Sequence, residues 1–244
     1  MSKAVLMEGV SYNYPDGKTA LKNINIEAAN NETMGIVGAN GSGKTTLLLN
    51  LNGILQGEGL INILGLEMKK SNLKEIRSKV GVVFQNPDDQ LFCPVVFEDV
   101  AFGLLNQGAD KQEVISKTDK ILRELELDGF KDKISHHLSA GEKKRVALAA
   151  VLVMDPEILV LDEPTANLDP HSRRHLIKIL KTLNHTKIIA THDLELVLEL
   201  AEKTIVLNKG EVKAEGKTKE ILSNKRLMEE NLLEVPLSLG LSHR

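Results

Sequence analysis

The segment 38–45 constrains this chain more than any other feature. It reads Gly-Ala-Asn-Gly-Ser-Gly-Lys-Thr and fits the pattern G-x-x-x-x-G-K-[ST] at every fixed position. Glycines at this spacing let backbone N–H groups curl around phosphates, while the lysine reaches the terminal phosphates and the threonine hydroxyl ligates Mg²⁺. A short apolar run, 33–37, precedes the motif, and a helical pattern, 45–53, follows it. The sequence therefore predicts nucleotide binding by Gly38, Ala39, Asn40, Gly41, Ser42, Gly43, Lys44, Thr45 and Thr46.

A second chemical element lies at 158–163, where an apolar run ends in two acidic residues, Asp162 and Glu163. Ligands of open α/β sheets bind at the carboxyl ends of the strands. We expect Asp162 to hold Mg²⁺ through water and Glu163 to polarise the attacking water as a general base. A strand followed by an acidic helix cap is common by itself, but the phosphate motif upstream favours the catalytic interpretation.

Periodicity predicts an α/β fold. The last third alternates strands at 157–161, 187–191 and 204–207 with helices at 170–183 and 193–201, which is typical of parallel strands covered by helices. The first quarter reads as strands at 5–14 and 21–28 around a turn. Between these regions we expect an amphipathic helix at 110–127 and a largely buried helix that begins at Ser139, with Glu142 at capping-box spacing.

Composition excludes several classes of protein. A net charge of −3, with 31 basic and 34 acidic side chains, shows no excess of positive charge that would favour nucleic-acid binding. The single cysteine, Cys93, excludes a disulfide framework and any zinc site built from several thiolates. No apolar run approaches the roughly 20 residues of a membrane span, and the start lacks the long apolar run of a secretory signal. We expect a cytosolic chain that reaches a membrane only through a partner.

With these motifs in order along the first 215 residues or so, the chain resembles the ATP-binding subunits of ABC transporters. Segment 138–142, Leu-Ser-Ala-Gly-Glu, is similar to the family's LSGGQ signature, which clamps the γ-phosphate of ATP held by the opposite subunit. The resemblance assigns that contact to Ser139, Ala140, Gly141 and Glu142. Ala140 stands where the family has glycine, so we expect a positive backbone φ there to be harder to adopt, and Glu142 stands for a glutamine.

Four further residues match family positions. The resemblance assigns Gln85 to the loop that touches Mg²⁺ and the attacking water, and Asp169 to the D-loop that links two composite sites. It makes His192 the switch histidine that contacts the γ-phosphate, and Tyr14 the aromatic residue that stacks on adenine. Each has a simpler interpretation: a turn glutamine, a helix cap, a structural histidine and a core tyrosine.

The resemblance also implies a fold and domain boundaries. It predicts a P-loop NTPase core with a parallel sheet flanked by helices, an N-terminal antiparallel β-subdomain and an inserted helical subdomain that carries the signature. The ATP-binding domain is expected at 1–216, the inserted subdomain at about 86–154, and a helical tail at 217–244. The role of this tail is left open.

The segment after Gln85 resembles the ATPases of energy-coupling-factor importers, above all the cobalt and nickel group. The resemblance implies a homodimer or heterodimer that binds ATP and Mg²⁺ at the cytoplasmic face of the membrane. It also implies integral membrane subunits and no direct contact with the transported substrate. A short helix of the membrane partner is expected in a groove formed by Gln90, Leu91 and Phe92, although these residues can equally be core.

Other classes fit the sequence less well. A soluble ABC-type ATPase acting on nucleic acid, ribosomes or cofactor assembly usually has two such domains, a coiled-coil insertion or extra basic surface. A small-molecule kinase has no reason to carry the Ser139 signature. Ala140 and Glu142 leave an inactive regulator as an alternative, although every hydrolytic residue is present. His171 and His175 are one helical turn apart, but Arg173 and Arg174 between them favour a solvated face over a metal site.

Overall fold

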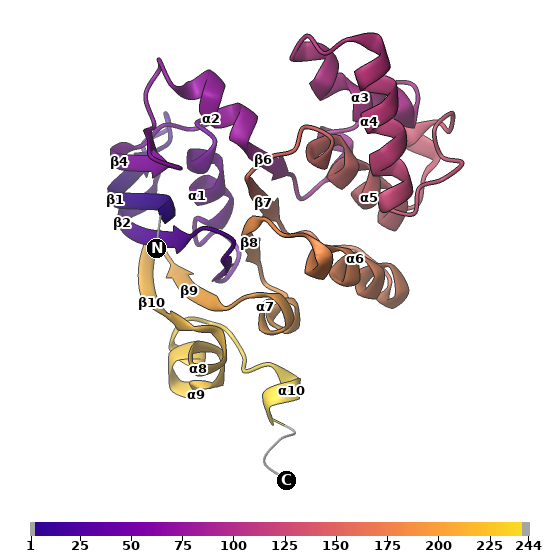
Figure 1. The fold of residues 1–244 in the computed structure, drawn as a ribbon. Helices are drawn as coiled ribbons and strands as arrows, with labels where there is room; N and C mark the ends of the chain where they lie inside the picture. The colour runs from indigo at the N-terminus through magenta and orange to yellow at the C-terminus, as the bar shows by residue number, and fades with distance from the viewer. Residues whose placement is uncertain (1–2, 241–244) are drawn as a thin grey trace. The chain divides into compact units, whose positions relative to one another are not determined.

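The computed structural model describes residues 3–240 and forms two compact units (Figure 1). The first unit runs up to Val80, includes Glu157–Glu163 and resumes at Asn184. The second unit consists of Gly81–Pro156 and Pro164–Leu183. Each unit is therefore discontinuous in sequence, and the chain passes between them at the ends of strands.

The first unit begins with a four-stranded antiparallel sheet of order β2-β1-β4-β5. Residues along much of β2 alternate between buried and exposed, as expected of a half-buried strand. The turn after β1 is closed by hydrogen bonds between Tyr14 N and Lys18 O and between Gly17 N and Tyr14 O, both 2.9 Å. The four strands are β1 (Lys3–Asn13), β2 (Thr19–Ala29), β4 (Glu58–Ile63) and β5 (Leu66–Glu67).

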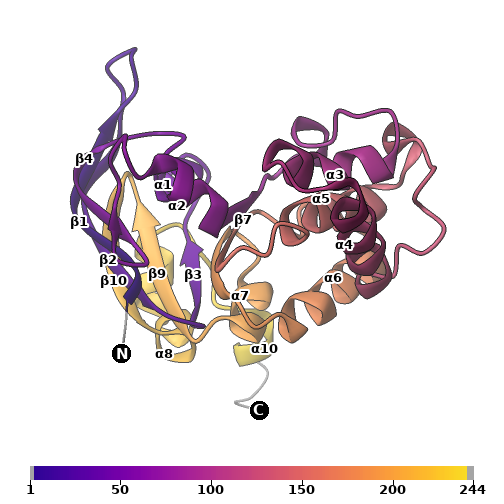
Figure 2. The same cartoon turned by 45° about the horizontal axis from the view of Figure 1, so that its top comes forward.

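A second sheet has the strand order β10-β9-β3-β8-β7-β6. Strand β3 pairs in parallel with β8 and β9, and β7 pairs in parallel with β8, whereas β10 returns antiparallel to β9 (Figure 2). Strands β3, β7 and β8 are buried along their whole length, as expected of parallel strands that are covered on both faces. The strands are β3 (Thr33–Val37), β6 (Val80–Val83), β7 (Ile158–Asp162), β8 (Thr186–Thr191), β9 (Lys203–Asn208) and β10 (Glu211–Lys217).

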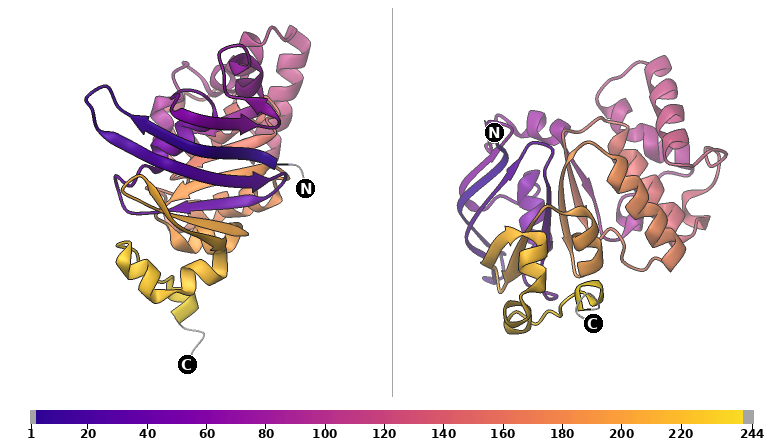
Figure 3. Two further views of the ribbon diagram at one scale, coloured as in Figure 1. Left: turned by 90° about the vertical axis from the view of Figure 1, so that its left-hand side faces the viewer. Right: turned by 60° about the horizontal axis from the view of Figure 1, so that its bottom comes forward.

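The helices of the first unit pack on this second sheet. Helix α1 (Lys44–Leu51) contacts β7 and β8, and α7 (Leu194–Leu200) contacts β3 and β8. The C-terminal helices lie beside β9 and β10 (Figure 3), where Leu222, Met228 and Leu233 share a buried cluster with Val197 and Val206. The remaining helices are α2 (Leu73–Lys79), α8 (Thr218–Ser223), α9 (Lys225–Glu230) and α10 (Leu237–Gly240).

The second unit is mainly helical. Helix α3 (Val96–Asn106) packs on α4 (Lys111–Glu124) and α5 (Ala140–Leu152), and α5 packs on α6 (Pro170–Thr182). Asp110 caps α4 by accepting hydrogen bonds from the backbone of Gln112 and Glu113. Two short 3-10 helices, η1 (Pro87–Asp89) and η2 (Ser135–His137), connect the longer elements. No helix within residues 3–240 is long and apolar enough to span a membrane.

The predicted α/β class, with an antiparallel N-terminal sheet and a separate group of helices, is confirmed. The segment 164–183 also joins the second unit, beyond the expected inserted stretch at about 86–154. Contacts between α5 and α6 explain this membership.

Candidate active site

The phosphate-binding loop lies between the buried strand β3 and helix α1. Gly41 and Gly43 have φ values of 76° and 107°, a left-handed backbone conformation that glycine adopts without strain. Gly38 has no room for a side chain, because a Cβ there would lie 2.2 Å from the carbonyl oxygen of Leu207. The loop thus opens directly into the N-terminus of α1, where free N–H groups favour an anion.

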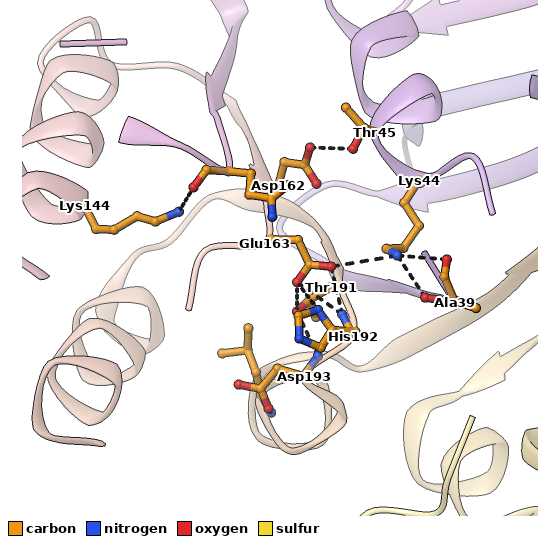
Figure 4. A network of polar contacts seen from close by, with 12 residues as sticks. Ala39, Lys44, Thr45, Lys144, Asp162, Glu163, Thr191, His192 and Asp193 are labelled. Carbon is orange, nitrogen blue, oxygen red and sulfur yellow. Dashed lines mark hydrogen bonds and ion pairs between the residues drawn. The ribbon is translucent and has the colours of Figure 1, made fainter. Parts of the chain in front are cut away.

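The ammonium group of Lys44 lies within this loop (Figure 4). Its Nζ donates hydrogen bonds to the carbonyl oxygens of Gly38 at 2.8 Å and Ala39 at 3.4 Å, and it lies 3.8 Å from Glu163 Oε1. Lys44 is buried, with 7% of its surface exposed. A buried cation in a loop of backbone N–H groups is suited to a phosphate, which is a stronger hydrogen-bond acceptor than the loop carbonyls.

Thr45 and Asp162 meet at the carboxyl end of β7. The hydroxyl of Thr45 donates to Asp162 Oδ2 at 2.7 Å, although the two residues are far apart in sequence (Figure 4). Asp162 is 5% exposed. Hydroxyl and carboxylate oxygens fit Mg²⁺, which usually takes only one or two protein ligands and completes its shell with water and phosphate oxygens. Two of the residues predicted to hold Mg²⁺, Thr45 and Asp162, thus lie within hydrogen-bond distance of each other.

Glu163 follows directly and has an unusual backbone, with φ at 44°. A hydrogen bond from its N–H to Ala190 O, 2.8 Å long, holds it at the edge of β8. A non-glycine residue in this conformation costs of order 1–3 kcal/mol, and such residues cluster at functional sites. The backbone therefore turns sharply at the end of β7, and the two adjacent carboxylates contact different residues: Asp162 contacts Thr45, and Glu163 contacts Thr191.

The carboxylate of Glu163 is 6% exposed and well supplied with donors. Its Oε2 accepts hydrogen bonds from Thr191 Oγ1 at 2.8 Å and from the backbone N–H of His192 at 3.2 Å. The ring Nδ1 of His192 lies 2.9 Å from the same oxygen. Since the His192 side chain is 63% exposed, the ring lies between the buried carboxylate and solvent. Such a carboxylate is fixed in orientation, as a general base needs to be.

Thr191 is a site residue that sequence reasoning missed. It is fully buried, it donates to Glu163, and its hydroxyl also accepts a hydrogen bond from Asp193 N at 3.0 Å. Its place immediately before His192 at a strand end was the available signal, but an interior threonine at the end of an apolar strand is easily taken for core.

Tyr14 lies beside α1 in the first unit. Its phenol oxygen is 2.9 Å from Thr46 Oγ1, and its ring meets Tyr12 edge-on with the ring centroids 5.1 Å apart. The tyrosine is half-buried. This places an aromatic side chain next to the helix that follows the phosphate loop, and its stacking on adenine stays a prediction.

Ser139 and Asp169 each cap a helix of the second unit. Ser139 and Glu142 form the complete capping box of α5 that their spacing predicts. Hydrogen bonds from the hydroxyl and backbone N–H of Ser139 lower the pKa of Glu142. Asp169 caps α6 by accepting from His171 N and Ser172 N, and hydrogen bonds led by Ser172 lower its pKa. Their contacts with nucleotide remain predictions.

The backbone at Ala140 does not use the conformation that alanine adopts less easily. Ala140 is the first residue of α5 and does not have a positive φ, so alanine fits this position without strain. Gly141 is the position that requires glycine, because a Cβ there would lie 2.5 Å from Ser172 Oγ on α6. Close packing of α5 against α6 is the physical reason.

The loop after β6 carries Gln85 and is held by two long side chains. Lys144, buried in α5, donates from Nζ to the carbonyl oxygen of Gln85 at 2.6 Å. Gln90 donates to Ala147 O at 3.0 Å and accepts from Phe84 N at 3.3 Å. Gln90 thus ties the loop to α5.

The predicted partner groove needs a correction at Leu91. Leu91 is 1% exposed and belongs to the core of the helical unit, so it cannot contact a partner. Phe92, by contrast, is 61% exposed and meets the ring of Phe102 edge-on at 4.8 Å. Leu105 is also exposed. The apolar surface at this place therefore consists of Phe92, Phe102 and Leu105.

Comparison with known proteins gives a consistent result. The family model described as ABC transporter matches residues 21–166. A putative ABC transporter ATP-binding protein of Gloeobacter violaceus is 48% identical over 98% of this chain and 100% of its own length. The energy-coupling factor transporter ATP-binding protein EcfA of Methanothermobacter thermautotrophicus is 45% identical over 98% of this chain and 78% of its own length.

Two solved structures extend this comparison. CbiO1 of Clostridium perfringens, described as part of the ABC transporter complex CbiONQ, has a TM-score of 0.84 and 38% identity, with 100% of both chains covered. A dimeric ATP-binding cassette bound to ADP and phosphate has a TM-score of 0.80 and 30% identity over 88% of this chain and 98% of its own. The chain therefore belongs to the ATP-binding subunits of ABC transporters, resembles the energy-coupling-factor members among them, and is an ATPase.

Proposed function

We propose that this ATPase drives uptake through membrane subunits of an energy-coupling-factor importer, with cobalt or nickel ions as the transported substrate. The observation that carries the catalytic part is the buried carboxylate of Glu163, which Thr191 and His192 orient and which lies 3.8 Å from Lys44. Relatives named EcfA and the likeness to CbiO1 support the importer class. The assignment of cobalt or nickel as the transported ion depends on the resemblance of segment 86–92 to the cobalt and nickel group.

In this proposal two subunits, identical or paralogous, close around two ATP molecules. Lys44 and the loop N–H groups of one subunit bind the phosphates, and Ser139 to Glu142 of the other contact the same γ-phosphate. Tyr14 stacks on adenine, and Asp169 links the two sites. Thr45, Asp162 and Gln85 would hold Mg²⁺, which would supply charge neutralisation to the phosphates.

Hydrolysis then depends on the orientation of Glu163. Its carboxylate takes a proton from the attacking water, and His192 contacts the γ-phosphate at the strand end.

We treat residues 1–216 as the ATP-binding domain, with the inserted helical part at about 86–154, and 217–244 as the tail. Closure of the dimer moves the membrane partner, which contacts the surface around Gln90 and Phe92 at the cytoplasmic face. The chain touches neither the transported ion nor nucleic acid.

Glu163→Gln tests the catalytic assignment. The variant keeps the size of the side chain but cannot accept a proton, so we expect turnover to fall by about 10²–10⁴-fold while ATP affinity changes little. Glu157→Gln is the matched control, because Glu157 lies at the opposite end of β7 in an exposed ion pair with Lys79. Turnover is followed by phosphate release and affinity by a labelled nucleotide. Retained turnover in Glu163→Gln would remove Glu163 from its role.

A second experiment tests the transport assignment. The tagged chain is purified from detergent-solubilised membranes and its companions are identified by mass spectrometry. Recovery of a polytopic membrane protein together with a small integral component, and uptake of radioactive cobalt or nickel by cells carrying the complex, would support the proposal. Recovery from the soluble fraction alone, with ribosomal or DNA-repair proteins, would favour the mechanical ATPase class instead.

A further inference from the structure

A hollow of about 490 Å³ lies on the second unit, and none of its lining residues is assigned above to nucleotide. Helix α6 supplies four of its lining residues, α5 supplies one, and the last is the second residue after the end of α4. They are Glu126, Arg145, His171, Arg174, His175 and Lys178. Five of the six side chains are basic, whereas the chain as a whole carries a net charge of −3.

The basic lining residues of α6 lie on one face of the helix. His171, Arg174, His175 and Lys178 follow the spacing that puts side chains on one helix face. Arg174 and Lys178 are four residues apart and carry like charges, which repel at this spacing. Asp169, the N-cap of α6, offsets the helix dipole but is not among the lining residues. An anion in the hollow would reduce the repulsion between Arg174 and Lys178.

Two of the lining groups are already oriented. Arg145 donates from Nη1 to the carbonyl oxygens of Leu125 at 3.2 Å and Glu126 at 3.0 Å, which fixes its guanidinium at the edge of the hollow. His175 is half-buried, and its Nε2 lies 3.2 Å from Glu126 Oε2. Glu126 is the one carboxylate of the lining, and its side chain is 74% exposed. The carboxylate can therefore swing into solvent when another anion arrives.

A metal site does not explain the two histidines. Their ring centroids are 6.4 Å apart, and the surrounding arginines and lysine repel a cation. Within residues 3–240 no group of three or more metal-ligating side chains was found. The chemistry of the lining, with planar guanidinium groups and an ammonium, instead matches the oxygens of a phosphate group.

We propose that this hollow binds a small phosphate-type anion, either inorganic phosphate or a short polyphosphate. Arg145 from α5 and Arg174 and Lys178 from α6 provide its permanent positive charges. The anion bridges α5 and α6, the two helices that begin at the capping residues Ser139 and Asp169. Binding therefore stabilises the packing of the helical unit.

Calorimetric titration of inorganic phosphate and of pyrophosphate tests this proposal. The chain carries Lys44→Ala, so that the phosphate loop contributes little to the measured binding. We expect Arg174→Gln and Lys178→Gln each to weaken binding about tenfold, because each removes a charged hydrogen-bond donor. Glu126→Gln removes the only negative charge and should tighten binding about threefold. Tighter binding of pyrophosphate than of phosphate would identify a polyphosphate as the preferred source of the group.

Lys181→Gln is the matched control, since it changes the same charge on the same helix outside the hollow. It should leave binding unchanged. If Lys44→Ala does not fold, the same titrations are done on the otherwise unaltered chain saturated with ADP. Absence of binding, an equal loss in Lys181→Gln, or no tightening in Glu126→Gln would overturn the proposal. None of these outcomes depends on ATP hydrolysis or on transport.

Discussion

Replacement of Thr191 by valine probes how the protein orients its catalytic carboxylate. The two side chains have nearly the same shape, so packing at this fully buried position is kept. The change removes a 2.8 Å hydrogen bond to the Glu163 carboxylate and leaves Asp193 N without its 3.0 Å acceptor. A hydrogen bond to a charged group contributes about 1.5–3 kcal/mol, and part of this loss is offset by burial of the extra methyl group. We expect Thr191→Val to lower the free energy of unfolding by roughly 2–3 kcal/mol.

The same change should also reduce catalysis. Without the threonine donor, the carboxylate of Glu163 loses one of the hydrogen bonds that orient it, and a misplaced general base costs about 10- to 100-fold in turnover. Because the chain has no tryptophan, unfolding is best followed by far-UV circular dichroism. At about 2–4 °C per kcal/mol for a chain of this size, the melting temperature should fall by about 4–12 °C.

Thr186→Val is the control for this prediction. Thr186 lies in the same strand β8, is 2% exposed, and accepts one neutral hydrogen bond from Asn31 N at 2.9 Å, at the end remote from Glu163. We expect a loss of about 1 kcal/mol in stability and unchanged turnover. If Thr191→Val retains full turnover and is no less stable than Thr186→Val, the orienting role of Thr191 is refuted.

Two further predictions concern titrating groups of the second unit. Burial, reinforced by Asp99, raises the pKa of the Cys93 thiol to about 11. Alkylation of Cys93 at pH 8 should therefore be about 100-fold slower than for a thiol of pKa 9, and its rate should rise up to pH 11. Rapid labelling at pH 8 would contradict this prediction. Ser139→Ala removes the hydroxyl hydrogen bond that contributes most to the lowered pKa of Glu142 but keeps the backbone N–H donor, and it should cost about 1 kcal/mol at pH 7. Since a lowered carboxylate pKa stabilises the fold only while the group is ionised, the part of this difference that comes from Glu142 should be full above the ordinary glutamate pKa. That part should be lost as the pH falls through the lowered value, as measured by urea unfolding at a series of pH values; a difference that does not change with pH would contradict the prediction.

Local features of this protein were predictable because their geometry depends on neighbouring residues. The phosphate loop needs glycines at fixed spacing, and the capping box needs only Ser139 and Glu142 within one helical turn. The strands and helices of the last third follow from periodicity alone, with ends that differ by only a residue or two from the structure. The strands β4, β5 and β10 carry weaker patterns and were not predicted.

Features that join distant segments required the tertiary structure. The hydrogen bond from Thr45 to Asp162 depends on β3 and β7 both lying next to β8, an order that differs from the order along the chain. The burial of Leu91 depends on the helices packed around it, because a leucine beside an exposed phenylalanine fits an apolar surface as well as a core. Segment 164–183 joins the helical unit through the contact of α6 with α5.

The sequence by itself determined the chemistry of the protein: a phosphate-binding loop, two carboxylates at a strand end and the family to which these belong. These features depend on residue types at short spacing along the chain, and the chain connectivity fixes the geometry of such neighbouring residues. The tertiary structure decided how that chemistry is held, through the left-handed backbone of Glu163, the donor from Thr191 and the basic hollow between Arg145 and α6. Each depends on packing between segments distant along the chain, and no local pattern specifies which distant segments will meet.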